Sequence, residues 1–121
     1  MSEPVKKRIL AVDNNIIFSE SIKIFFQERG YSISICTEAD MVLAMAAEFQ
    51  PDVILLDLKM GSVSGLDILR EIRSRDRKVK IVVLTGSIDS KKISSAQLLG
   101  ADEYMIKPVG MADLKGVVDR L

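Results

Sequence analysis

The sequence predicts an open α/β fold in which a doubly wound, five-stranded parallel sheet carries helices on both faces. Three observations predict it. Short apolar runs alternate with amphipathic stretches of helical spacing, two of the runs are apolar at every position, and glycines follow the first and fourth helical stretches. Strands that alternate with helices form right-handed βαβ units and therefore a parallel sheet. A length of 121 residues suits one such domain.

The expected strands are runs of four or five residues, which is strand length rather than helix length. They cover residues 9–12, 32–36, 53–56, 80–84 and 103–106. Residues 53–56 and 81–84 are apolar throughout, which is typical of strands buried between two layers of helices.

The expected helices lie between these runs. Their apolar residues recur at intervals of three and four within residues 18–26, 42–49 and 111–121, and less regularly within 66–74 and 89–99. Gly30 and Gly100 occupy the C′ position after a helix, where a left-handed backbone is favoured. Thr37, with Asp40 three residues later, predicts a capping box at the start of the second helix.

The composition excludes several classes of protein. Acidic and basic residues balance at 17 each, so the chain lacks the overall positive field of a dedicated nucleic-acid binder. The absence of histidine excludes Ser-His-Asp catalysis and His-based zinc sites. Cys36 is the only cysteine, which excludes an internal disulfide and fits a reducing compartment. No apolar run approaches the ~20 residues that span a bilayer, so we expect a soluble cytoplasmic protein.

The carboxyl ends of the predicted strands carry Asp13, Asn14, Asp57, Thr85 and Lys107. In open α/β sheets, ligands bind beyond this edge. Two carboxylates on neighbouring strands repel each other unless a cation or a proton lies between them, and Mg²⁺ suits oxygen ligands of this kind. With a metal, a fixed ammonium group and a hydroxyl donor nearby, a carboxylate can accept a phosphoryl group as an acyl phosphate. On spacing alone a structural ion network remains the alternative, because such networks also gather charges.

Five motifs, in order along the chain, resemble the receiver domains of two-component response regulators, including the single-domain chemotaxis type. They are ILAVD at 9–13, PDVILLDLKM at 51–60, GL at 65–66, VLTG at 83–86 and GADEYMIKP at 100–108. Each motif is weak alone, but together they are specific. The resemblance covers residues 8–121. It implies a single receiver domain over residues 1–121, with the flavodoxin-like (βα)5 fold and strand order 2-1-3-4-5.

The resemblance also implies a role for each polar residue at the strand ends. Asp57 matches the aspartate that takes a phosphoryl group from a histidine kinase. Asp13 matches the first residue of the acidic pair that organises Mg²⁺, and the backbone carbonyl of Lys59 would be a further metal ligand. The Thr85 hydroxyl would bind a phosphoryl oxygen, and the Lys107 ammonium would pair with the phosphoryl group. The chain would then be a switch and not an enzyme.

In the same family an aromatic residue, matched here by Tyr104, changes rotamer as the threonine moves. Phosphorylation would therefore alter the surface of the fourth helix, fifth strand and fifth helix. The implied partners are a histidine kinase or phosphotransfer protein, a downstream protein or effector domain, and a second copy in a phosphorylation-dependent homodimer. No direct contact of this domain with nucleic acid or membrane is implied. Family members usually hold the bond matching Lys107–Pro108 in the cis form.

The sequence departs from the family pattern beside the acceptor. Asn14 stands where the second acidic residue is usual; its amide oxygen can coordinate Mg²⁺ but brings no charge, so we predict weaker Mg²⁺ binding. Gly61 replaces a common proline and should make its loop more mobile. The resemblance implies that the side chains of Lys59 and Ser87 border the phosphoryl pocket, and the Lys59 ammonium would then either help to neutralise the phosphoryl group or point into solvent.

Two other functions compete with a phosphorylatable receiver. A pseudo-receiver would bind a partner without being phosphorylated, and Asn14 is the feature that favours it. A flavin-binding electron carrier could share the architecture, but Asp13 would repel phosphate after the first strand, and there is no tryptophan to cover a flavin.

Overall fold

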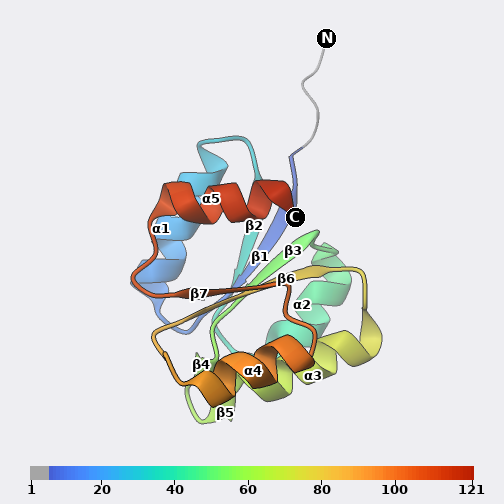
Figure 1. Cartoon of the computed structure of the whole chain (residues 1–121). Helices are drawn as coiled ribbons and strands as arrows, with labels where there is room; N and C mark the ends of the chain where they lie inside the picture. Colours follow the sequence, from blue (N-terminus) through green and yellow to red (C-terminus); the bar gives the residue numbers. More distant parts are fainter. Residues whose placement is uncertain (1–5) are drawn as a thin grey trace.

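The computed structural model describes residues 6–121, which form one five-stranded parallel sheet between two layers of helices (Figure 1). The strand order is β2-β1-β3-β6-β7, which confirms the predicted order 2-1-3-4-5, because β4 and β5 form a separate two-stranded hairpin. The sheet strands are β1 (Arg8–Val12), β2 (Ser32–Cys36), β3 (Val53–Leu56), β6 (Lys80–Thr85) and β7 (Glu103–Ile106), and the hairpin strands are β4 (Lys59–Met60) and β5 (Val63–Ser64).

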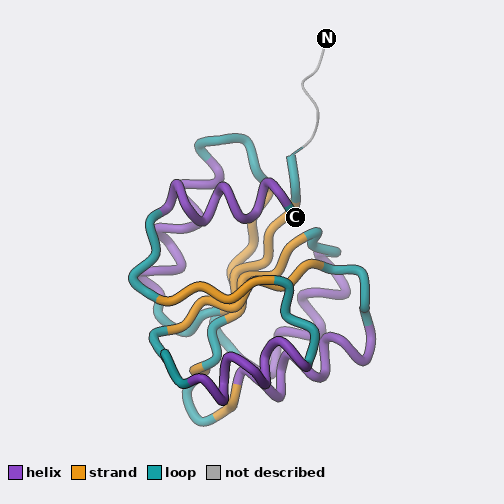
Figure 2. Tube along the Cα trace, in the orientation of Figure 1, coloured by secondary structure: helices purple, strands orange, loops and turns teal. Residues whose placement is uncertain are grey.

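The helices divide between the two faces of the sheet. One face carries α1 and α5, and the other carries α2, α3 and α4 (Figures 1 and 2). Their bounds are α1 (Ile16–Gln27), α2 (Val42–Phe49), α3 (Gly65–Arg75), α4 (Ser90–Leu98) and α5 (Met111–Arg120), and a 3₁₀ turn, η1 (Ala39–Met41), precedes α2. Within residues 6–121, none of these helices has both the length and the hydropathy that a membrane span requires.

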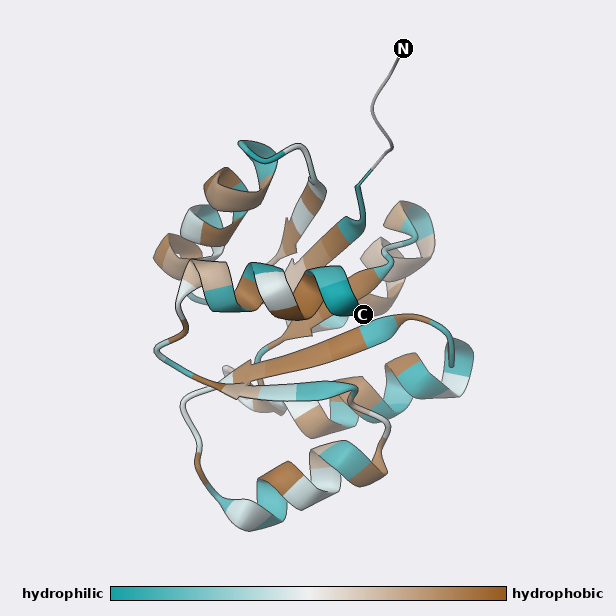
Figure 3. Ribbon diagram, turned by 45° about the horizontal axis from the view of Figure 1, so that its top comes forward, coloured by the Kyte–Doolittle hydropathy of each residue, from teal (hydrophilic) through white to brown (hydrophobic). Residues whose placement is uncertain are grey.

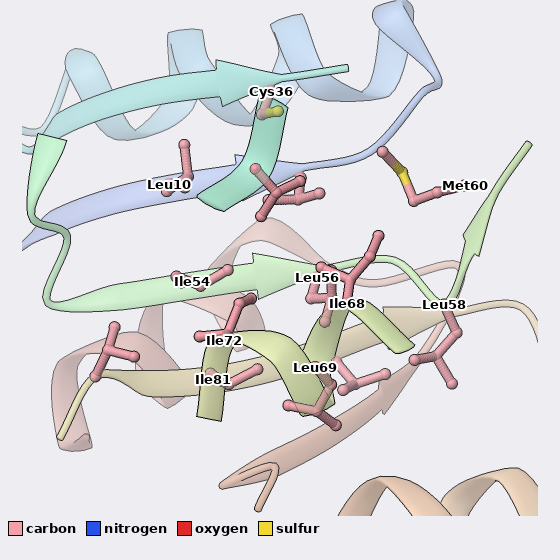
Figure 4. Close-up of a cluster of buried hydrophobic side chains, with 14 of the residues drawn as sticks. Leu10, Cys36, Ile54, Leu56, Leu58, Met60, Ile68, Leu69, Ile72 and Ile81 are labelled. Carbon is pink, nitrogen blue, oxygen red and sulfur yellow. The ribbon is translucent and has the colours of Figure 1, made fainter. Parts of the chain in front are cut away.

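The core consists of two apolar clusters, one on each face of the sheet. Successive side chains of a strand point to opposite faces. In β3, Ile54 and Leu56 accordingly join the cluster under α2, α3 and α4 (Figure 4), whereas Val53 and Leu55 join the cluster under α1 and α5. Figure 3 shows the central strands as hydrophobic nearly throughout, while the helices alternate between hydrophobic and hydrophilic residues. This double burial is what the apolar runs in the sequence predict.

The register of the parallel strands brings the predicted polar residues to one edge. Val12 pairs with Leu56, so Asp13 and Asp57, the next residues along each strand, leave the sheet side by side. On the other side of β3, β6 ends at Thr85, which pairs with the last residue of β7 immediately before Lys107. The ends of four strands thus supply the site.

Most predicted helix ends are confirmed. Gly30 and Gly100 have φ values of 88° and 103°, as expected after a helix. The predicted capping box at Thr37 is wrong. The residue before η1 is Glu38, which makes no side-chain capping hydrogen bond, and α2 begins only at the fully buried Val42. Burial of Val42, rather than a polar cap, fixes the start of the helix.

Candidate functional site at the carboxyl edge of the sheet

One ammonium group lies between two buried carboxylates at this edge. The Lys107 Nζ atom is 2.6 Å from Asp13 Oδ2 and 3.6 Å from Asp57 Oδ2. Asp13 and Asp57 are both buried, whereas Lys107 is partly exposed. Carboxylates this close require a cation between them, and in this structure the lysine provides it.

Asp57 is held by the backbone on one side and faces Lys107 on the other. Its N–H donates to the Val12 carbonyl at 2.9 Å, which continues the pairing of β3 with β1. Its Oδ1 accepts the Lys59 N–H at 3.1 Å, and its Oδ2 faces Lys107. Burial raises the pKa of the Asp57 carboxyl above the ordinary aspartate value, although the Lys59 N–H and the Lys107 ammonium act in the opposite direction. The carboxylate is therefore poorly solvated, and its charge is balanced by the partners named above.

Asp13 is bound by the first turn of α1. Its Oδ1 accepts the Asn15 N–H at 2.9 Å, and its carbonyl oxygen accepts the Ser19 hydroxyl at 3.2 Å. The remaining carboxylate oxygen, Oδ2, accepts the Lys107 ammonium. Both carboxylate oxygens and the carbonyl oxygen of Asp13 therefore accept hydrogen bonds.

An open pocket leads from the solvent to Asp57. Thr85 and Lys107 line it together with Asp57, and Lys92 of α4 also reaches it. The sequence motifs give Lys92 no part in this pocket. The remaining walls come from the β4–β5 hairpin and the loop after β6, namely Leu58, Lys59, Gly61, Ser62, Val63, Ser64, Gly86 and Ser87.

The hairpin beside Asp57 is a feature that the sequence pattern did not predict. β4 and β5 pair in antiparallel fashion through Lys59 with Ser64, around a turn in which Gly61 has a φ of 63°. Gly61, which stands where proline is common in the family, therefore adopts the left-handed backbone that this turn requires. Directly after the hairpin, a Cβ on Gly65 would lie 2.4 Å from Leu58 Cα and 2.5 Å from the Asp57 carbonyl oxygen. Only glycine allows α3 to start this close to Asp57, which explains the glycine of the GL motif.

Ser87 connects the two residues of the predicted switch. The Thr85 hydroxyl oxygen accepts the Ser87 N–H at 3.3 Å, and the Tyr104 hydroxyl donates to the Ser87 carbonyl at 3.0 Å. Tyr104 is half-buried beside α4, and burial, together with the charge of Asp89, raises the pKa of its hydroxyl. A displacement of Thr85 would therefore act on Tyr104 through a single intervening residue.

Lys107 is also placed by its own backbone. Its N–H donates to the Thr85 carbonyl at 2.8 Å, and the Lys107–Pro108 bond is cis, as predicted. The backbone hydrogen bond ties Lys107 to the end of β6, and its ammonium group reaches the two carboxylates.

The oxygen atoms at this edge fit a hard divalent cation. Asp13 and Asp57 present two carboxylates to one shared cation position, and oxygen ligands of this kind suit Mg²⁺. Asn14 is exposed and lines a neighbouring hollow between α1 and η1, beside Glu38 and Asp40. Within residues 6–121, no cluster of three or more acidic or cysteine side chains is arranged to hold a metal, which is consistent with an amide at position 14.

The chain matches a known family along nearly its whole length. The model of the response regulator receiver domain matches residues 9–119. The DNA-binding response regulator MtrA of Mycobacterium tuberculosis is 31% identical over 106 residues, which are 88% of this chain and 46% of the relative. Response regulator MprA of Mycobacterium leprae is 33% identical over 107 residues, 88% of this chain and 47% of the relative. The chain thus spans about half the length of the curated relatives it matches.

Solved structures agree with this assignment. A CheY-like receiver domain protein from Methanospirillum hungatei has a TM-score of 0.88 at 28% identity, with 94% of each chain covered. A response regulator from Burkholderia pseudomallei, whose structure contains a phosphorylated aspartic acid and a calcium ion, has a TM-score of 0.87 at 26% identity, over 93% of this chain and 66% of that one. The chain belongs to the response regulator receiver domain family, whose members typically serve phosphorylation-based two-component signalling and bind Mg²⁺.

Proposed function

We propose that Asp57 accepts a phosphoryl group from a phosphohistidine of a histidine kinase or phosphotransfer protein. One Asp57 carboxylate oxygen forms a bond to phosphorus as the P–N bond of the donor breaks, and the bonding electron pair remains on the imidazole nitrogen. The observation that carries the proposal is the ammonium of Lys107 between the buried carboxylates of Asp13 and Asp57, at 2.6 Å and 3.6 Å, beside an open pocket.

The residues around Asp57 have distinct parts in this transfer. The Lys107 ammonium balances charge that develops on the phosphoryl oxygens, and the Thr85 hydroxyl, which lines the same pocket, donates to one of them. Asp13, Asp57 and the Lys59 carbonyl would hold Mg²⁺, with Asn14 able to add an amide oxygen. When bound, Mg²⁺ supplies neutralisation of the acceptor and phosphoryl oxygens.

In our proposal, Asn14 weakens this metal site, because the family usually has an acidic residue at that position. Affinity of oxygen sites for hard cations depends on the number of ligand charges, and Asn14 contributes none. Phosphorylation of this chain should therefore require more Mg²⁺ than is usual for the family.

We propose that the signal leaves through the surface formed by α4, β7 and α5. The chain Thr85–Ser87–Tyr104 runs from the pocket to this surface. An apolar side chain is exposed on it, because Ile106 of β7 is 38% exposed. Such a surface suits a downstream protein, an effector domain of the same protein or a second copy of this chain.

A small acyl phosphate donor with Mg²⁺ tests the proposal. We expect a phosphorylated adduct that is absent in Asp57→Asn and slower to form in Lys107→Ala. A folded Asp57→Asn variant that still forms the adduct would place the acceptor elsewhere. If no adduct forms with the parent chain at any Mg²⁺ concentration, the chain is a pseudo-receiver, the alternative that Asn14 favours.

A further inference from the structure

A closed ring of contacts surrounds the Asp13 carboxylate, and it includes a residue to which no role has been given so far. The Asn15 N–H donates to Asp13 Oδ1 at 2.9 Å, and the Asn15 side chain accepts the Phe18 N–H at 3.0 Å. The aromatic ring of Phe18 then lies under the Lys107 ammonium, 4.3 Å from Nζ to the ring centroid. Lys107 completes this cycle of contacts by donating to Asp13 Oδ2 at 2.6 Å.

Each of these contacts restricts the position of a different group. Asn15 is the N-cap of α1, so its bond to the Phe18 N–H fixes where the first helical turn begins. Phe18 is half-buried and packs against the core cluster under α1 and α5, which holds its aromatic plane in place. A lysine ammonium, by contrast, is a compact charge on a flexible stem with four carbons. Two carboxylates alone would let it move from one to the other.

The face of an aromatic ring attracts a cation within about 6 Å of its centroid. Phe18 therefore attracts the ammonium with a ring that does not line the pocket of Asp57. It holds Nζ close to Asp13 and leaves the pocket side of Lys107 available to an incoming anion.

We propose that Phe18 is a positioning residue for phosphoryl transfer. Its ring holds the Lys107 ammonium where it can balance charge on the phosphoryl group, while Phe18 itself does not contact that group. The proposal rests on the proposed function of Asp57 as phosphoryl acceptor. An apolar residue of the same size without an aromatic face would fill the same space but would not hold the charge.

Site-specific replacement of Phe18 by mono-, di- and trifluorinated phenylalanine tests this proposal. Fluorine removes electron density from the ring face and weakens the attraction for a cation with little change in size. We expect the initial rate of Asp57 phosphorylation by a small acyl phosphate to fall stepwise along the series, on the order of threefold to tenfold in total. Phe25 is the matched control, because its ring lies 3.7 Å from the Arg29 guanidinium carbon, outside the pocket of Asp57. The same series at Phe25 should leave the rate unchanged.

Two further measurements make the outcome decisive. Phe18→Trp should keep the parental rate, whereas Phe18→Leu should be as slow as the trifluorinated chain. Independently of phosphorylation, NMR should show ring-current shifts on the Lys107 side-chain protons that disappear in Phe18→Leu. A flat fluorine series at Phe18, or parental Lys107 shifts in Phe18→Leu, would overturn the proposal. Failure of the parent chain to be phosphorylated at all would instead overturn the function proposed for Asp57.

Discussion

At the scale of single residues, the Asp57 carboxylate is less stable as an anion in the folded chain than in the unfolded chain, because burial raises its pKa. A raised folded-state pKa means that the folded chain binds the proton more tightly. Stability then falls as the pH rises from the unfolded aspartate value of about 3.9 through the raised folded value, and the loss persists at neutral pH. The acceptor is thus kept charged at a cost to the fold.

The first prediction follows from the loss of stability that the charged Asp57 carboxylate causes. Asp57→Asn, which is uncharged and similar in size, should increase the free energy of unfolding at pH 7, and the gain should shrink as the pH falls toward 3. Urea unfolding at several pH values measures it. Asp67→Asn, at an exposed position of α3, should show no such gain. A less stable Asp57→Asn at pH 7 would show that the Lys107 ammonium outweighs the desolvation of Asp57.

The second prediction concerns Asn14. Asn14→Asp adds a charged ligand beside Asp13 and should tighten Mg²⁺ binding roughly tenfold, as measured by titration calorimetry. Asn15→Asp is the matched control, since it adds the same charge one residue later and can still cap α1. Equal Mg²⁺ affinities in the parent chain and Asn14→Asp would contradict the weakened metal site.

The sequence predicted that Asp13, Asp57, Thr85 and Lys107 would lie close together, because each stands at the carboxyl end of a predicted parallel strand. It could not identify the contact between Phe18 and Lys107. These residues are far apart in the chain, and the helical spacing of Phe18 is equally consistent with an ordinary core position. The approach of Lys92 to the pocket was missed for a similar reason, because it depends on where α4 starts beside the hairpin.

At the scale of secondary-structure elements, the start of α3 is the point at which backbone packing sets the position of Asp57. A Cβ at Gly65 would overlap the Leu58 backbone and the Asp57 carbonyl, so the chain would have to move. Gly116 offers a useful contrast: it is exposed within α5, and nothing lies within 4 Å of an added Cβ.

The third prediction compares alanine at these two glycines. Gly65→Ala should lower the free energy of unfolding by about 3 kcal/mol and slow the phosphorylation of Asp57, because overpacking displaces the backbone beside it. Gly116→Ala should raise the free energy of unfolding by about 0.5–1 kcal/mol with no effect on phosphorylation. Equilibrium unfolding and adduct formation measure both. An unaffected phosphorylation rate in Gly65→Ala would show that α3 does not position the acceptor.

The elements that the sequence predicted best are those with long apolar patterns. All five sheet strands were predicted within one residue at each end, because strands buried on both faces leave little choice of residue. The β4–β5 hairpin has only two residues per strand, too few for any period to be recognised. The apolar spacing of residues 42–49 predicted α2 correctly, whereas the capping box at Thr37 was wrong, because a 3₁₀ turn that starts after Glu38 precedes the helix.

At the scale of the whole molecule, one sheet connects the acceptor to the surface that we propose for signalling. β6 supplies Thr85 to the pocket and pairs with β7, which carries Tyr104. Ile106, the last residue of β7, is 38% exposed at the end of that connection. In our proposal, phosphorylation would change this surface through Tyr104, which packs against the core cluster under α2, α3 and α4.

The fourth prediction concerns association through this surface. Sedimentation should show more dimer after treatment with an acyl phosphate donor and Mg²⁺ than before it. Ile106→Ser should suppress that increase, because it removes an exposed apolar contact from β7. Ile24→Ser is the control, since Ile24 is 54% exposed on α1, a helix that is not part of the proposed surface. A donor-dependent increase that survives in Ile106→Ser but is lost in Ile24→Ser would place the interface on α1.

The central claim is that Asp57 becomes an acyl phosphate with the help of Asp13, Lys107 and a weakly held Mg²⁺. Mass spectrometry of the donor-treated chain, with and without Mg²⁺, tests it most directly. We predict one added phosphoryl group, located on the peptide that contains Asp57, with a yield that rises with Mg²⁺ into the millimolar range, on the order expected for a site short of one charged ligand. A phosphoryl group on another residue, or a chain that stays unmodified at every Mg²⁺ concentration, would contradict the claim.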